Sequence, residues 1–155
     1  MIGPRPLDAV ATVVTGDDVT SPFTGARAAF FHVALLELGG AGAEHALGEM
    51  VLGDVVVLRV AEAGVDVALV VRRATVRLVS VRTGGTPLDA LARLPPEAVP
   101  LLARSRGQGT PCFREHAVRQ GARVRLRATV EGSGSRAFVR DDLAPVFVDE
   151  LLGGG

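Results

Sequence analysis

Polar and apolar residues alternate along several short stretches of this chain, and a period of two is typical of β-strands. The clearest case covers residues 123–130. There Arg123, Arg125 and Arg127 share one face, and apolar side chains share the other. We therefore predict an amphipathic strand with one buried face and one arginine-lined face.

Further strands are predicted wherever apolar or alternating runs are bounded by glycine, proline or aspartate. A run that includes Ala74–Val81 places Val76 and Leu78 on one face and Thr75 and Arg77 on the other. The turn at Gly64 predicts a hairpin between two of the strands. The predicted strands are residues 8–15, 28–38, 55–60, 65–71, 74–81, 136–139 and 146–148, and residues 113–118 lead into a turn at Gly121.

Helical signals are confined to one region. Thr86 is suited to cap a helix that begins at Pro87, and Pro95-Pro96-Glu97 opens a second short helix to about Arg106. Residues 44–49 read as a helical turn or a loop, and residues 107–111 read as a loop. About eight short strands with glycine-rich turns favour a mainly β fold. The expected architecture is a small closed or partly open OB-like β-barrel with one helical insertion around residues 87–106.

Composition narrows the class of protein. The 155 residues carry 17 basic and 17 acidic side chains, with no lysine, tryptophan or tyrosine. A balanced charge argues against a dedicated nucleic-acid binder. One cysteine excludes an internal disulfide, and no apolar run is long enough to span a bilayer. We expect one domain over residues 1–150, a flexible tail at 151–155 and a cytoplasmic location, with no signal for a cofactor.

Four short motifs follow one another between Val10 and Val130. Each is a turn or strand pattern that is weak by itself, and their shared order and spacing give them weight. They are Ser21-Pro22-Phe23-Thr24-Gly25 leading into Phe30-Phe31-His32-Val33 and Glu37; Gly64-Val65-Asp66-Val67 followed by Ala74-Thr75-Val76-Arg77-Leu78; Pro95-Pro96-Glu97; and Arg114-Glu115-His116-Ala117-Val118 followed by Gly121, Val124 and Leu126.

This order resembles the GIDE-type domain, also called the BAM (beside-a-membrane) domain, found in membrane-anchored mitochondrial E3 ubiquitin ligases and in bacterial membrane proteins. The chain departs from that pattern at Arg27-Ala28, where the family carries Pro-Cys, and it has no transmembrane helix or RING finger. Ligase activity in such proteins belongs to the RING. The resemblance therefore implies a non-catalytic, mainly β, protein-interaction module of a soluble bacterial protein, with an unidentified protein partner.

Two surfaces are candidates for that interaction, besides any free sheet edge. One is the turn-rich loop with Ser21, Phe23, Thr24 and Arg27, and the other is the arginine face at Arg123, Arg125 and Arg127. The alternative function is nucleic-acid or anionic-ligand binding through the arginine face. The opposing interpretation is a solvated face that is partly paired with acidic residues, and the scarcity of aromatic side chains favours it.

Catalytic and metal-binding patterns are poorly supported. Cys112 and His116 would lie roughly 13 Å apart on a strand, too far for a thiol–imidazole pair. The three histidines are scattered without metal-ligand spacing. We expect Glu115 to be structural, accepting backbone N–H bonds or pairing with an arginine. No catalytic, cofactor or metal residue is therefore assigned.

Overall fold

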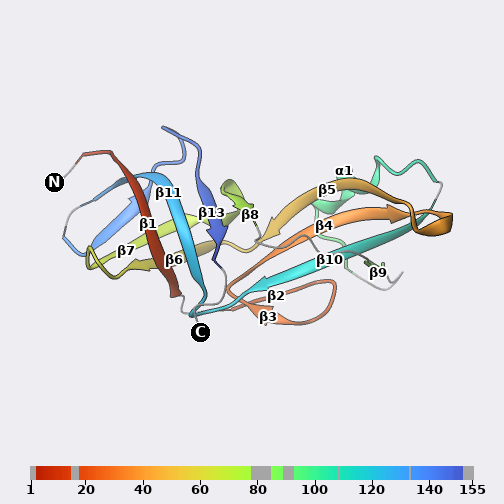
Figure 1. The fold of residues 1–155 in the computed structure, drawn as a ribbon, viewed down its shortest axis with the longest axis horizontal. Helices are drawn as coiled ribbons and strands as arrows, with labels where there is room; N and C mark the ends of the chain where they lie inside the picture. The colour runs from red at the N-terminus through yellow and green to blue at the C-terminus, as the bar shows by residue number, and fades with distance from the viewer. Residues whose placement is uncertain are drawn as a thin grey trace.

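A five-stranded barrel and a second, four-stranded sheet form the two ends of an elongated molecule (Figure 1). The computed structural model describes residues 3–14, 18–77, 85–88, 93–107, 109–132 and 134–151. Both sheets are assembled from segments that are far apart in the chain. Two insertions between barrel strands pair with each other and form the second sheet.

The barrel closes in the strand order β1-β6-β7-β12-β11 and back to β1. The β7–β12 pair is parallel and the other four pairs are antiparallel. This is an OB-like order, in which the fifth barrel strand inserts between the third and the fourth. The prediction of a small β-barrel is confirmed. Its strands are β1 (Arg5–Val14), β6 (Val55–Val60), β7 (Val65–Val70), β11 (Arg123–Glu131) and β12 (Arg136–Val139).

Two more strands extend the barrel sheet beyond β11. β13 (Phe147–Glu150) pairs antiparallel with β11, and β8 (Thr75–Arg77) pairs parallel with β13. In β8 the Val76 side chain is buried and its two neighbours are exposed, as the alternation predicts. The rest of that predicted strand, residues 78–81, lies outside the described residues.

The second sheet has the order β5-β4-β10-β9. Its first two strands come from the insertion between β1 and β6, and its last two come from the insertion between β7 and β11. A two-stranded ribbon, β2 (Val19–Thr20) with β3 (Arg27–Ala28), frames the loop between them. The strands of the sheet are β4 (Phe30–Leu38), β5 (Glu44–Leu52), β9 (Thr86–Pro87) and β10 (Thr110–Val118).

The helical insertion expected around residues 87–106 is confirmed by the short helix α1 (Ala98–Leu102). Its predicted first turn is wrong, because Thr86 and Pro87 do not start a helix. They form β9, which pairs with Cys112 and Phe113 of β10. Residues 89–92 of the predicted helix lie outside the described residues. Two 3-10 turns complete the described elements, η1 (Gly40–Gly42) and η2 (Val71–Arg73).

Residues 44–49 are the second correction, because they belong to strand β5 and not to a helical turn or loop. The register of β5 on β4 shifts between Leu35 and Leu36, so Leu47 is an extra, bulged residue. Gly48 next to it has φ +150°. The bulge interrupts the period of two, which is why this stretch does not look like a strand in the sequence. The predicted loop at 107–111 likewise ends early, since β10 begins at Thr110.

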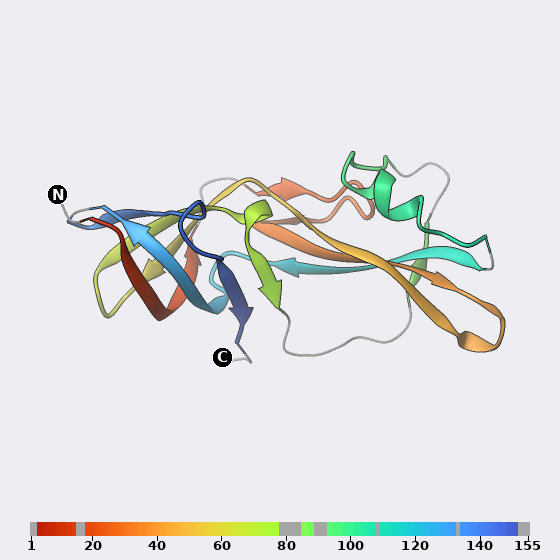
Figure 2. The same cartoon turned by 90° about the horizontal axis from the view of Figure 1, so that it is seen from above.

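Two hydrophobic cores meet at the junction of barrel and second sheet. Phe30 lies in the barrel core with Val118, and the next residue, Phe31, lies in the core of the second sheet. Phe30 and Val118 are cross-strand partners at the ends of β4 and β10. These two strand ends therefore contribute side chains to the barrel core. Figure 2 shows β4 and β10 running from the barrel into the second sheet.

Candidate functional site

The loop between β2 and β3 is held by hydrogen bonds of its own. The Ser21 hydroxyl oxygen accepts from the backbone N–H of Phe23 at 3.1 Å and of Thr24 at 3.3 Å. The Thr24 hydroxyl oxygen accepts from the N–H of Ala26 at 3.2 Å. Gly25 has φ +76°, a left-handed conformation that glycine adopts without strain. The sequence Ser-Pro-Phe-Thr-Gly thus specifies one compact turn.

Glu115 of β10 fixes this loop to the second sheet. One of its carboxylate oxygens accepts from the Ser21 hydroxyl, and the other accepts from the Thr24 hydroxyl at 2.6 Å. The Phe23 ring stacks on Phe113 with ring centroids 4.9 Å apart. Of the loop residues proposed as a contact surface, Ser21 is buried and Phe23 is half-buried, while Thr24 and Arg27 are exposed.

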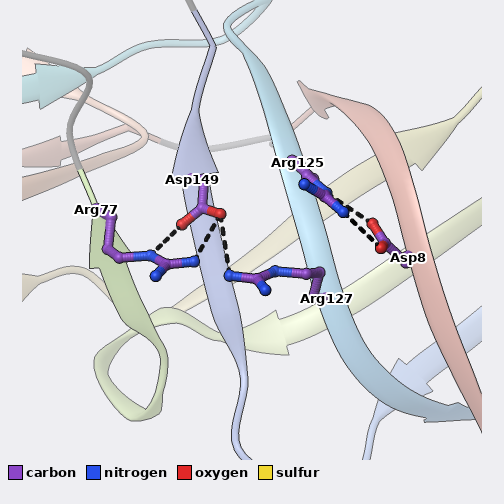
Figure 3. Close-up of polar contacts among 5 residues, drawn as sticks. All are labelled: Asp8, Arg77, Arg125, Arg127 and Asp149. Carbon is purple, nitrogen blue, oxygen red and sulfur yellow. Dashed lines mark hydrogen bonds and ion pairs between the residues drawn. The ribbon is translucent and has the colours of Figure 1, made fainter.

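The predicted arginine face exists on the outside of β11, where alternate residues are buried in the barrel core. Arg125 makes a two-pronged ion pair with Asp8 of β1 at 2.8 and 2.7 Å. Arg127 donates to Asp149 of β13 at 3.3 Å. The two arginines turn in opposite directions, each toward the acidic residue of a neighbouring strand (Figure 3).

A second arginine shares the Asp149 carboxylate. Arg77 of β8 donates to it at 2.6 and 2.9 Å. The guanidinium carbons of Arg77 and Arg127 also lie 5.1 and 5.0 Å from the centre of the Phe147 ring. This distance is within the range of a cation–π contact. The cluster is an internal network of charges on the barrel surface and not a row of unpaired cations.

These pairs shift the pKa values of their members. The hydrogen bond from Arg125 lowers the pKa of the Asp8 carboxyl, and Asp8 raises the pKa of Arg125. The hydrogen bond to Asp149 likewise raises the pKa of Arg77. Arg123 is exposed and has no ion-pair partner within the part of the chain that the structure describes. Only one of the three predicted arginines is therefore available to an external anion without breaking a pair.

Cys112 and His116 each contact another residue, so they do not form a reactive thiol–imidazole pair. The buried Cys112 thiol donates to the Thr110 carbonyl at 3.4 Å, and burial raises the pKa of that thiol. His116 Nε2 contacts the Glu150 carboxylate of β13. Both residues thus have structural partners, and a thiol with a raised pKa is a poor nucleophile at neutral pH.

The other histidine on this sheet face also has a carboxylate partner. His32 is the cross-strand partner of His116, and its Nε2 lies 3.3 Å from Glu49. Among the described residues, no three His, Cys, Asp or Glu side chains gather in a way that could hold a metal ion.

An apolar surface on the outside of the barrel hairpin β6–β7 was not predicted from the sequence. Val55 and Phe138 are 55% and 48% exposed, two of six large apolar side chains that are exposed among the described residues, and it is a connected patch rather than a single exposed residue that is informative. The register joins them into one patch, because Val55 pairs with Val70, Val57 pairs with Ala68, and Ala68 pairs with Phe138. We call Val55, Val57, Ala68, Val70 and Phe138 the outer apolar face.

A signal for this face is present in the sequence. Residues 55–58 are apolar at every position, so one strand face would have to be buried against the core and the other against something else. In the structure Val56 and Leu58 fill the barrel core, while Val55 and Val57 point outward. Apolar residues at consecutive positions of a barrel strand therefore indicate that the outer face of that strand is apolar as well as the inner face.

Comparison with protein-family models, with curated proteins and with solved structures gives no match to this chain. Within the described residues, no helix combines the length and the apolar character needed to cross a bilayer.

Proposed function

We propose that this chain is a non-catalytic protein-interaction module that binds its partner through the outer apolar face of the barrel. The observation that carries the proposal is the exposure of Val55 and Phe138 within one connected apolar patch. Contiguous apolar patches rimmed by polar residues mark protein contact sites. Full burial of an exposed Val or Phe side chain is worth about 1.5–3 kcal/mol, and Val55 and Phe138, at 55% and 48% exposure, can gain only part of it.

The rim of the patch is polar on the hairpin side. Arg59 and Asp66 form an ion pair there at 2.9 Å, and Arg136 is the register partner of Asp66. An apolar centre with a charged rim is the usual anatomy of a specific protein interface. The proposal agrees with what the resemblance to GIDE/BAM domains implies, and it moves the contact surface away from the two surfaces suggested by the sequence.

Those two surfaces have internal partners that support this choice. The Ser21 and Thr24 hydroxyls already bind Glu115, and Arg125 and Arg127 already bind Asp8 and Asp149. A partner would have to replace these bonds, which costs free energy that the apolar face does not require. Nucleic-acid binding through the arginine face, the alternative function, is disfavoured for the same reason.

Photo-crosslinking in the cells that express the protein tests the proposal. A photoreactive phenylalanine analogue is placed at Val55 or Phe138, and as a matched control at Val99 of α1, which is 58% exposed. We expect discrete crosslinked proteins from positions 55 and 138 and none from position 99. Equal patterns from all three positions, or no adduct from positions 55 and 138, would refute the proposal.

A further inference from the structure

We infer that the partner of the outer apolar face is a second copy of this chain, which makes the protein a face-to-face dimer. This inference rests on the proposed function and adds the identity of the partner. The order of residues across the strands decides whether the surface is complementary to itself. A twofold-symmetric interface requires such self-complementarity.

The surface consists of rows that run across four barrel strands in the order β1, β6, β7 and β12. The central row is Val14, Val57, Ala68 and Phe138, and it is apolar throughout. The next row toward the hairpin turn is Thr12, Arg59, Asp66 and Arg136, and it is polar throughout. Charges of opposite sign thus stand on the two middle strands, at the same height.

A twofold axis parallel to the strands, between β6 and β7, keeps each row at its height and exchanges the two middle strands. It places the Arg59–Asp66 ion pair of one copy against the same pair of the other with the signs reversed, so that four charges form one cluster and neither in-chain pair has to break. In the central row it places the large Phe138 opposite the small flank at Val14. The outside of a barrel is convex, so the surfaces of two facing copies diverge toward β1 and β12. The large Phe138 side chain fills the gap that opens there.

A second ion pair at the other end of the hairpin repeats the pattern with the signs reversed. Asp54 lies just before β6 and Arg72 just after β7, and their charged atoms are 3.9 Å apart; Arg72 also donates to Glu97 at 3.2 Å. The same axis brings Asp54 of one copy toward Arg72 of the other. Equal numbers of acidic and basic residues in the chain also remove the long-range repulsion that would oppose self-association.

Sedimentation velocity of the full chain from low to high micromolar concentration tests the inference. We expect a concentration-dependent dimer, and we expect Phe138→Asp to weaken it at least tenfold. Val99→Asp is the matched control, because Val99 is at least as exposed as Phe138, 58% against 48%, but lies on α1. Unchanged circular dichroism shows that the variants fold. A wild-type chain that stays monomeric throughout would overturn the inference.

Charge reversal gives a sharper test, because mixing two variants should restore the dimer that each variant alone has lost. Arg59→Asp alone sets two acidic residues against each other across the axis and within the chain, and Asp66→Arg alone does the same with two arginines, so circular dichroism again checks that each variant folds. We expect each single variant to be mainly monomeric. An equimolar mixture of the two restores opposite charges and should form a mixed dimer, as should the double variant by itself. A mixture that stays monomeric would contradict the proposed axis.

The two levels of proposal fail differently. A monomeric wild type whose position 138 still crosslinks to another protein removes the second copy but keeps the protein-interaction module. A monomeric wild type with no crosslink at position 138 removes both. A crosslinked species of twice the mass of the chain supports both.

Discussion

Phe30 and Phe31 are neighbours in the chain, yet their fully buried side chains lie in two different hydrophobic cores. Strand β4 causes this division, because successive side chains of a strand point to opposite faces. At the junction one face of β4 looks into the barrel and the other into the second sheet. The two ends of the molecule are therefore joined by a strand that belongs to both cores.

Truncating each phenylalanine should weaken a different part of the molecule. We expect Phe30→Ala and Phe31→Ala each to cost about 3–5 kcal/mol of folding free energy. Native-state hydrogen exchange distinguishes them. Phe30→Ala should reduce protection mainly in β11, and Phe31→Ala mainly in β5. Equal losses in both strands from either variant would show that the two cores unfold as one.

The Glu115 contacts predict how the loop between β2 and β3 responds to mutation. Glu115→Ala leaves the Ser21 and Thr24 hydroxyls without their acceptor, so we expect a loss of about 1–3 kcal/mol in urea unfolding. Glu115→Gln keeps one acceptor oxygen and should cost less. Glu62→Ala, in the exposed turn after β6, is the control. Unchanged exchange of the Phe23 and Thr24 amides in Glu115→Ala would rule out the anchoring role.

Gly53 predicts a steric effect at the junction of the two cores. A Cβ added there would lie 2.9 Å from both Phe30 Cβ and Val71 Cγ1, and the residue has φ +154°. Gly64 also has a positive φ, +61°, but its added Cβ would meet nothing within 4 Å. We expect Gly64→Ala to cost about 1–2 kcal/mol from the backbone alone. Gly53→Ala should cost clearly more in thermal unfolding, and an equal cost would contradict the close packing.

The Asp8–Arg125 pair predicts a pH dependence with a definite sign. The hydrogen bond from Arg125 holds the pKa of folded Asp8 below its ordinary value of 3.8. Its contribution to stability is therefore present above pH 3.8 and is lost as the pH falls through the folded pKa. Carbon-13 NMR titration of the Asp8 carboxyl measures this midpoint. Arg125→Gln should move it upward, and an unchanged midpoint would show that the pair does not form in solution.

Neutralising the partners of the arginine face should create anion binding that we do not expect of the wild type. We expect fluorescence anisotropy with single-stranded DNA to stay flat for the wild type at low salt. The double variant Asp8→Asn/Asp149→Asn releases Arg77, Arg125 and Arg127 and should bind with a steep salt dependence. Salt-dependent binding by the wild type itself would favour the alternative function.

The barrel could be predicted from the sequence because its strands follow simple rules. The alternation of Arg123–Val130 predicted the position and faces of β11, and the turn at Gly64 predicted the hairpin of β6 and β7; the structure confirms both. The second sheet could not be assembled in this way. Its strands pair over long sequence separations, and the bulge at Leu47 hides the period of β5.

The candidate surfaces, too, could be predicted from the sequence only in part. The alternation predicted that Arg125 and Arg127 point outward, but not that Asp8 and Asp149 stand beside them. That information lies in the register between strands, which the sequence of one strand does not contain. The outer apolar face was missed because an apolar run in a strand is first interpreted as core. The exposure of Val55 depends on how the barrel closes.

Hydroxyl-radical labelling of Phe138 is the most direct test that the outer apolar face contacts a protein. Its oxidation is compared between dilute purified protein and the native lysate, with Val99 as the internal reference in the same chain. The account predicts strong protection of Phe138 in the lysate and an unchanged reference. Equal oxidation of Phe138 in both samples would contradict it.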